Sequence, residues 1–238
     1  MTRPLVLAAH GTADPQGQAV VRQVAADAAA VLGVEHRVGF VDVCGPTLAE
    51  ALADLAPAAG SDTRAAGAGP APVVVPFFLA SGYHVRHDVP AAVRELGHDP
   101  LAVVTPALGV EPEVVTALVE RVLEAEAAPA ALVLVSAGSS VEGARGEVAD
   151  LADRVGERLG IPADVAFLSG PGPRPAEVSA TVGERPVVLA AHLLAPGHFL
   201  GLAHRAAEQH GASTTEALGT HTALTDLVVR RYRKLLPG

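Results

Sequence analysis

The sequence predicts an α/β fold built from two duplicated domains, each with a four-stranded parallel sheet and helices on both of its faces. Three observations support this prediction. Four short segments recur in the same order in the two halves of the chain. Their strand portions are continuous apolar runs, as expected for strands that are buried on both faces. Segments with a helical spacing of apolar residues separate them, which is the βαβ pattern of a doubly wound sheet.

The repeat consists of four matched segments, each formed by a strand and the turn that follows it. Residues 5–12 (LVLAAHGT) match residues 132–140 (LVLVSAGSS) at a shift of 127 positions. The other matched segments are residues 34–48 with 161–175 at the same shift, 72–84 with 186–198 at a shift of 114, and 103–109 with 213–219 at a shift of 110. Four matches in one order indicate a duplicated domain.

The segments between the strands predict helices and two irregular connections. Residues 18–32 and 114–127 are rich in Ala, Val and Leu with charged residues between them, and we expect both to be helical. Residues 56–71 are rich in Ala, Gly and Pro, so we expect a surface loop there, and its loss from the second half accounts for the falling shift. With a linker at residues 126–130, the expected domains are residues 1–127 and 128–238.

Composition excludes several functional classes. The net charge of −9 argues against a nucleic-acid partner, which needs a basic surface. The single cysteine, Cys44, excludes an internal disulfide and a thiolate cage around a metal. The single lysine, Lys234, lies outside any glycine-rich loop, which excludes a nucleotide-binding P-loop. The apolar runs are too short for a membrane span or a signal-peptide core, so we expect a cytoplasmic protein without a membrane partner.

Three polar residues stand at the ends of predicted strands in the first half. His10 follows the first strand, Asp42 ends the second, and His84 comes just after the third. Because the carboxyl ends of parallel strands meet at one edge of the sheet, these side chains are expected to converge on one crevice. Two imidazoles and a carboxylate would form an incomplete coordination sphere for Fe²⁺, Co²⁺ or Ni²⁺, with positions open to a substrate.

The motifs around these residues resemble those of a known family. The opening LVLAAHGT with His10, the FVD segment that ends at Asp42, and the segment PFFLASGYHVRHDVP with His84 are similar to the class II chelatases that act on sirohydrochlorin. The resemblance covers the chain as two flavodoxin-like, chelatase-like halves. It implies ATP-independent insertion of Fe²⁺ or Co²⁺, with Ni²⁺ as a further candidate, into a tetrapyrrole of sirohaem or cobalamin biosynthesis, with no resident cofactor.

The resemblance also implies roles for individual residues. His10 and His84 would hold the metal and help to deprotonate the macrocycle, and Asp42 stands where the family usually has Glu. Aspartate is one methylene shorter, which leaves open whether Asp42 contacts the metal or only supports a ligand. Substrate-binding roles are expected for five residues, with Arg86 and His87 meeting carboxylates, Ser139 donating at a helix N-terminus, and Phe78 and Tyr83 walling the macrocycle.

The second half departs from this pattern. Ala137 and Ser169 replace His10 and Asp42, whereas His198 matches His84. A single imidazole does not make a metal site, so we expect this half to enclose the substrate. A duplicated chain can close its own crevice, which favours a monomer. The histidines without a motif are expected to be surface or core residues, and they are His36, His98, His192, His204, His210 and His221.

Two other functions are compatible with parts of the sequence. A non-catalytic carrier of a metal or tetrapyrrole would use the same crevice, and turnover would distinguish it from an enzyme. Histidine phosphatases also end their first strand in His-Gly, but they need an arginine before the histidine, and Ala9 occupies that position. The choice among iron, cobalt and nickel stays open, because the same nitrogen and oxygen ligands accept all three.

Overall fold

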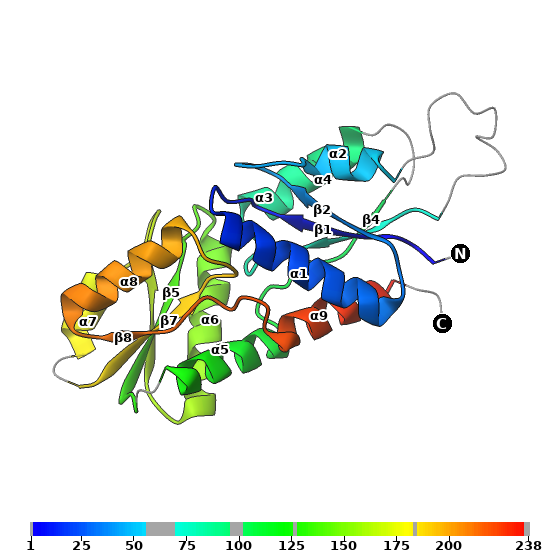
Figure 1. Ribbon diagram of the computed structural model, residues 1–238. Coiled ribbons are helices and arrows are strands. Elements are labelled where there is room, and N and C mark those ends of the chain that lie inside the picture. Colours follow the sequence, from blue (N-terminus) through cyan, green and yellow to red (C-terminus); the bar gives the residue numbers. More distant parts are fainter. Residues whose placement is uncertain (1, 56–69, 96–101, 126–127, 183–184, 236–238) are drawn as a thin grey trace, which may run out of the picture.

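The computed structural model describes residues 2–55, 70–95, 102–125, 128–182 and 185–235. Within these ranges the chain forms two lobes, each built on a four-stranded parallel sheet (Figure 1). The first sheet has the order β2 (His36–Phe40), β1 (Leu5–Ala9), β3 (Val73–Pro76), β4 (Val103–Val104), and the second has the order β6 (Ala163–Phe167), β5 (Ala131–Ser136), β7 (Val187–His192), β8 (Ser213–Thr214). The predicted fold class is confirmed. His98, residues 56–69 of the expected loop and residues 126–127 of the expected linker lie outside the described residues.

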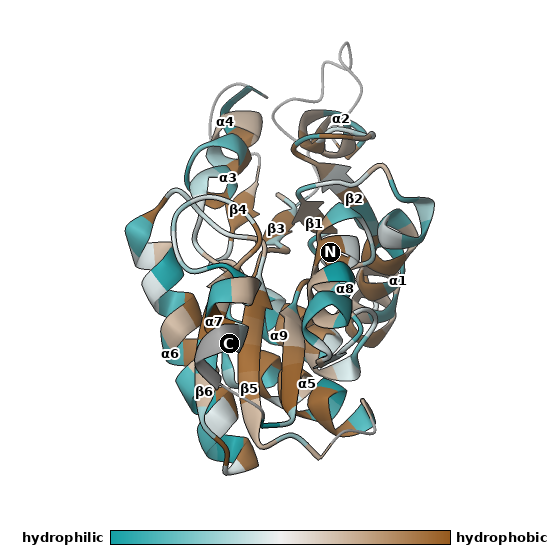
Figure 2. Cartoon of the chain, turned by 90° about the vertical axis from the view of Figure 1, so that its left-hand side faces the viewer, coloured by the Kyte–Doolittle hydropathy of each residue, from teal (hydrophilic) through white to brown (hydrophobic). Residues whose placement is uncertain are grey.

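Helices cover both sheets. Their bounds are α1 Pro15–Leu32, α2 Leu48–Ala53, α3 Tyr83–Arg86, α4 Asp88–Glu95, α5 Pro112–Glu124, α6 Glu142–Leu159, α7 Pro175–Val182, α8 His198–His210 and α9 Thr222–Arg233. The central strands β1 and β5 are buried along their whole length. Figure 2 shows the hydrophobic colour on these strands and hydrophilic residues along the outer side of α6. Across the described ranges, no helix has both the length and the apolar character that a membrane span requires.

The helix ends follow local sequence signals. The expected helix at residues 18–32 begins earlier, at Pro15, because Asp14 caps it by accepting the backbone N–H of Gln16. It ends at Gly33, whose φ of 66° is the left-handed conformation that glycine adopts easily. Helix α5 begins at Pro112, two residues before its expected start.

The sheet register refines the repeat. Leu5 pairs with His36 and Leu132 with Ala163, which reproduces the shift of 127 between the halves. In the third strands Leu5 pairs with Val73 and Leu132 with Val188, a shift of 115 rather than 114. The first half therefore has one more residue between its third strand and its motif histidine than the second half has.

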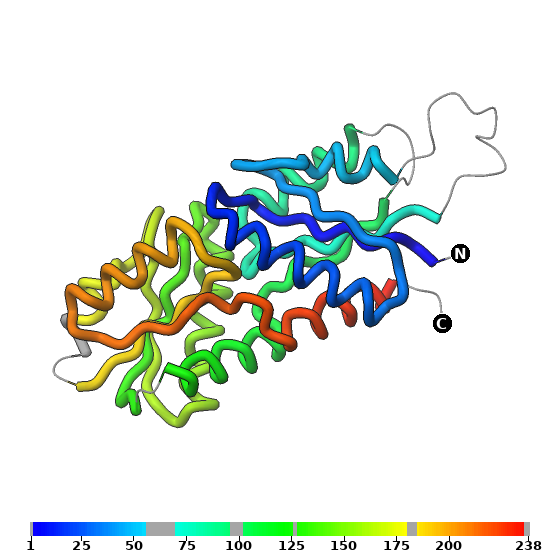
Figure 3. Tube along the Cα trace, viewed as in Figure 1, coloured from blue at the N-terminus to red at the C-terminus, as the bar shows by residue number. Residues whose placement is uncertain are grey.

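The two halves exchange their last helices. Helix α5 packs against α6 and β7 of the second lobe, and α9 packs against α1 and β3 of the first. Figure 3 shows the red C-terminal tube beside the blue α1. Buried apolar residues of both helices, such as Leu118 and Leu227, belong to a core cluster that runs through both lobes. Each lobe is thus completed by a helix of the other half, while the division at residue 127 stays a prediction.

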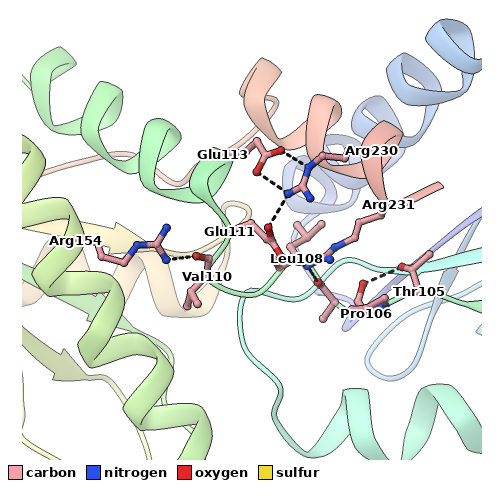
Figure 4. Close-up of polar contacts among 10 residues, drawn as sticks. Thr105, Pro106, Leu108, Val110, Glu111, Glu113, Arg154, Arg230 and Arg231 are labelled. Carbon is pink, nitrogen blue, oxygen red and sulfur yellow. Dashed lines mark hydrogen bonds and ion pairs between the residues drawn. The ribbon is translucent and has the colours of Figure 1, made fainter. Parts of the chain in front are cut away.

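An ion-pair network ties α9 to the segment that leads into α5 (Figure 4). Arg230 donates from Nε to Glu113 at 2.6 Å and from Nη2 to Glu111 at 2.7 Å, and these hydrogen bonds lower the pKa of both carboxyls. The buried Arg231 donates from Nη2 to the Ala107 carbonyl at 2.9 Å and to Glu111 at 2.7 Å. These contacts hold residues 107–113, which lead from the first lobe into α5, against α9.

Candidate functional site

A cleft of about 1090 Å³ is lined by the carboxyl ends of strands from both sheets. The first half contributes the turn after β1 and the segment from Phe77 to Val85, and the second contributes the turns after β5 and β7. A volume of this size suits a large organic ligand. No lysine or arginine belongs to the described residues that line it.

His10 and His84 face one another in this cleft. Their ring centroids are 4.3 Å apart, with the ring planes at 47°. His10 has a buried Nδ1 that finds no hydrogen-bond partner within the described part of the chain. The predicted convergence of the two histidines is therefore present in the structure.

Asp88 orients His84. The Nδ1 of His84 in α3 lies 2.5 Å from Oδ2 of Asp88, the first residue of α4. Because a carboxylate only accepts hydrogen bonds, Nδ1 carries the proton, and in the neutral ring the lone pair is on Nε2. This is the arrangement in which a carboxylate behind a histidine prepares it as a metal ligand.

The turn after β1 positions His10 through its backbone. The His10 carbonyl accepts the N–H of Asp42 at 2.9 Å. Gly11, at a φ of 102°, lies so close to this segment that a Cβ atom would come 2.1 Å from the Asp42 carbonyl oxygen. Glycine is required there by both conformation and space, which explains the His-Gly pair after the strand.

Asp42 does not join the two histidines. Its side chain is exposed, is absent from the lining of the cleft, and accepts the backbone N–H of Val43 at 2.7 Å. Within the described residues no group of three His, Cys, Asp or Glu side chains could hold a metal ion. The expected convergence of three ligands is thus reduced to two, because the chain turns back after β2 with Val43 at a φ of 66°. Cys44 packs against the hydrophobic core, as a small apolar residue would.

The expected substrate-binding residues divide into two groups. Phe78, Tyr83 and Ser139 line the cleft, although Ser139 Oγ also accepts the N–H of Val141 at 3.1 Å and so acts as a local cap. Arg86 and His87 are exposed and do not line it. Arg86 donates from Nε to the Ser81 carbonyl at 2.8 Å, and the His87 ring lies 4.5 Å from that of Tyr83. Their placement does not support a role for either in substrate binding.

In the second half, the counterparts of the first-half residues lie where the repeat predicts. Ser169 Oγ donates to the Ala137 carbonyl at 2.6 Å. His198 is the exposed first residue of α8 and lines the cleft, and its ring centroid lies 5.5 Å from that of Phe199. His192, expected to be a surface or core residue, is buried at the end of β7 and lines the cleft, and burial lowers its pKa to about 4.

Asp88 and His192 lie at the site, but neither was assigned a role there from the sequence. The spacing of four between His84 and Asp88 is a usable signal, since side chains four positions apart come close in a helical turn, although the two residues belong to the successive helices α3 and α4. His192 gave no signal, because its position at a strand end is defined by a sheet register that differs by one residue from the motif match.

Fold and cleft together define a duplicated, doubly wound α/β protein with a ligand-sized cleft between its lobes. The chain belongs to the CbiX family, whose sequence model matches residues 4–125 and 131–235. The resemblance to class II chelatases is thereby confirmed.

Individual relatives agree with this assignment. A curated protein of Methanopyrus kandleri named sirohydrochlorin cobaltochelatase is 35% identical over 97 residues, which make up 40% of this chain and 59% of that protein. The structure described as SirB from Bacillus subtilis with Fe³⁺ has a TM-score of 0.81 and 20% identity over 98% of this chain and 95% of that chain. CbiX, described as the terminal enzyme for biosynthesis of siroheme in denitrifying bacteria, has a TM-score of 0.71 and 18% identity over 99% of this chain and 100% of that chain. These two structural likenesses establish the fold.

Proposed function

We propose that this protein inserts a divalent metal ion into a tetrapyrrole of the sirohydrochlorin type, without a nucleotide. One observation carries the proposal: the imidazoles of His10 and His84 lie with centroids 4.3 Å apart in a cleft of about 1090 Å³. The names of the relatives, which refer to sirohydrochlorin, cobalt and Fe³⁺, support the same substrate and metals.

The histidine pair suits a metal that must be surrendered. Two neutral imidazoles bind Fe²⁺, Co²⁺ or Ni²⁺ and leave most coordination positions free. Four pyrrole nitrogens of an incoming macrocycle can then displace them. A thiolate cage would hold the ion too tightly, and the half-buried Cys44 lies against the core instead.

The same pair can also take up protons. Insertion exchanges two pyrrole N–H protons for one M²⁺ ion, so the charge balances when both protons leave. Once Nε2 of His84 has released the metal, its lone pair can accept one proton, and Asp88 at 2.5 Å stabilises the imidazolium that forms. His10, whose ring lies 4.3 Å from that of His84, can accept the other at the ring nitrogen that carries its lone pair.

The test is multiple-turnover metalation of sirohydrochlorin under anaerobic conditions, followed by absorbance, with Fe²⁺, Co²⁺ and Ni²⁺ in separate reactions. We expect several turnovers per protein in the absence of ATP, and the relative initial rates identify the preferred metal. Product that stops at one equivalent would instead establish a carrier, and a requirement for ATP would contradict the proposed mechanism.

A further inference from the structure

A polar pair lies at the ends of two neighbouring strands in the second half. Ser136 ends β5 and His192 ends β7, and the two residues are partners in the sheet register. The Nδ1 of His192 lies 3.3 Å from Oγ of Ser136. His192 is 3% exposed and lines the cleft, yet its Nε2 has no hydrogen-bond partner within the described ranges.

The first half has apolar residues at the same places. Since Val73 and Val188 occupy equivalent register positions, Phe77 is the counterpart of His192, and by the same reasoning Ala9 is the counterpart of Ser136. Phe77 is 1% exposed and packs in the core. A buried imidazole nitrogen without a partner destabilises the fold relative to one that makes its hydrogen bond. The first half fills the equivalent position with phenylalanine, whereas His192 needs a ligand or a water molecule to complete its hydrogen bonding.

The chemistry of the cleft indicates what that ligand offers. Among the described lining residues there is no cationic lysine or arginine, and the second half also lines the cleft with the hydroxyl groups of Ser139 and Ser140. When the Ser136 hydroxyl donates to Nδ1, the neutral imidazole is left with Nε2–H as a donor. The second half thus provides neutral hydrogen-bond donors suited to carboxyl oxygens.

We infer that His192, held by Ser136, is a substrate-positioning residue that donates a hydrogen bond from Nε2 to a carboxyl group on the inserted edge of the tetrapyrrole. The inference rests on the proposed function for the identity of the ligand. A macrocycle with carboxylate arms on every pyrrole ring buries some of them when an edge enters the cleft. Each buried arm needs a donor. The two halves then have different roles. The pair of His10 and His84 binds the metal, and the pair of Ser136 and His192 binds the periphery of the macrocycle.

The test compares equilibrium binding of metal-free sirohydrochlorin, followed by ligand fluorescence, in wild type and three variants. His192→Phe installs the residue of the first half, and His192→Gln keeps a neutral donor of similar reach. His204→Phe is the control, because His204 on α8 also has a buried Nε2 without a hydrogen bond among the described residues, 3.9 Å from Oε1 of Glu216, and does not line the cleft. Two further titrations are made on each protein. One measures the binding of Co²⁺ to the free protein, and the other measures the binding of the octamethyl ester of sirohydrochlorin.

We expect His192→Phe to weaken sirohydrochlorin binding about tenfold, the size of one lost hydrogen bond, and to raise KM with kcat little changed. His192→Gln and His204→Phe should bind within about threefold of wild type, Co²⁺ affinity should be unchanged in all of them, and the ester should bind wild type and His192→Phe alike. Wild-type affinity in His192→Phe, an equal loss with the ester, or a parallel loss of Co²⁺ affinity would each overturn the inference.

Two further results keep the test decisive. If His192→Phe does not fold, Ser136→Ala removes only the hydroxyl that orients the ring: binding weakened about threefold or more supports the inference, and a smaller change overturns it. Failure of the proposed function can be distinguished from failure of this inference. Wild-type protein that binds sirohydrochlorin through His192 but never inserts metal would refute the chelatase and leave the subsite in place.

Discussion

Arg231 on α9 and Arg121 on α5 make equivalent contacts in the two lobes. Each donates from Nη2 to a main-chain carbonyl in the segment that precedes the other helix. Arg231 donates to Leu108 at 3.4 Å, and Arg121 donates to Leu218 at 3.0 Å. The four residues correspond at the shift of 110 that relates the fourth strands. The duplication therefore extends to the exchanged helices, and the contacts that hold the lobes together are themselves repeated.

The first prediction concerns the ion pairs of Arg230. Its guanidinium is about two-thirds buried and makes a two-pronged contact with Glu113, so Arg230→Ala should lower the free energy of unfolding by about 1–3 kcal/mol. Urea denaturation at pH 7 measures this loss. Arg37→Ala is a suitable control, because its pair with Glu35 is more exposed and should contribute under about 1 kcal/mol.

The second prediction is the acid dependence of the same network. Arg230 lowers the pKa of Glu111 and Glu113 in the folded state below the ordinary value of 4.5. Their contribution to stability is therefore complete above pH 4.5 and is lost as the pH falls below that value through the lowered folded-state pKa. The difference in unfolding free energy between wild type and Arg230→Ala should shrink on acidification, measured by urea denaturation from pH 7 to pH 3. A difference that stays constant over this range would show that the pair acts without its charges.

The third prediction uses Val43, a β-branched residue at a φ of 66°. Its counterpart at the shift of 127 is Gly170, with a φ of 67°. Val43→Gly relieves backbone strain but adds entropy to the unfolded chain, so we expect a net stabilisation of about 0.5–1 kcal/mol by chemical denaturation. The reciprocal variant Gly170→Val should destabilise the protein, and stabilisation by both substitutions would refute the strain argument.

The fourth prediction compares the contributions of Asp88 and Asp42 to metal affinity. Asp88→Asn keeps a hydrogen-bond acceptor for Nδ1 of His84 but removes the charge behind the ring, so Co²⁺ affinity should fall about tenfold or more. Asp42→Asn should have little effect, because Asp42 is exposed and bonded to the Val43 backbone. Isothermal titration of Co²⁺ into both variants makes the comparison. A larger loss in Asp42→Asn would return that residue to the metal site.

Much of this molecule could be predicted from its sequence, because parallel strands buried on both faces leave unbroken apolar runs and the duplication shows them twice. The convergence of His10 and His84 followed from their places at strand ends. The exchange of α5 and α9 could not be predicted, because the apolar face of a helix does not specify which of the two sheets it packs against. The direction of the Asp42 side chain depends on a tight turn with an unusual φ at Val43, which no periodicity reports. The polar pair of Ser136 and His192 was hidden by the one-residue difference in register.

The central claim is that metal handling belongs to the first half alone, and steady-state metalation by His84→Ala and His198→Ala tests it most directly. Both histidines line the cleft and lie in the first turn of matched helical segments, but among the described residues only His84 has an imidazole partner at 4.3 Å and a carboxylate at 2.5 Å. With folding verified by circular dichroism, we predict that His84→Ala lowers kcat by about 100-fold or more, as expected when a metal ligand and proton acceptor is removed, whereas His198→Ala changes KM alone. An equal collapse of kcat in the two variants would contradict the account.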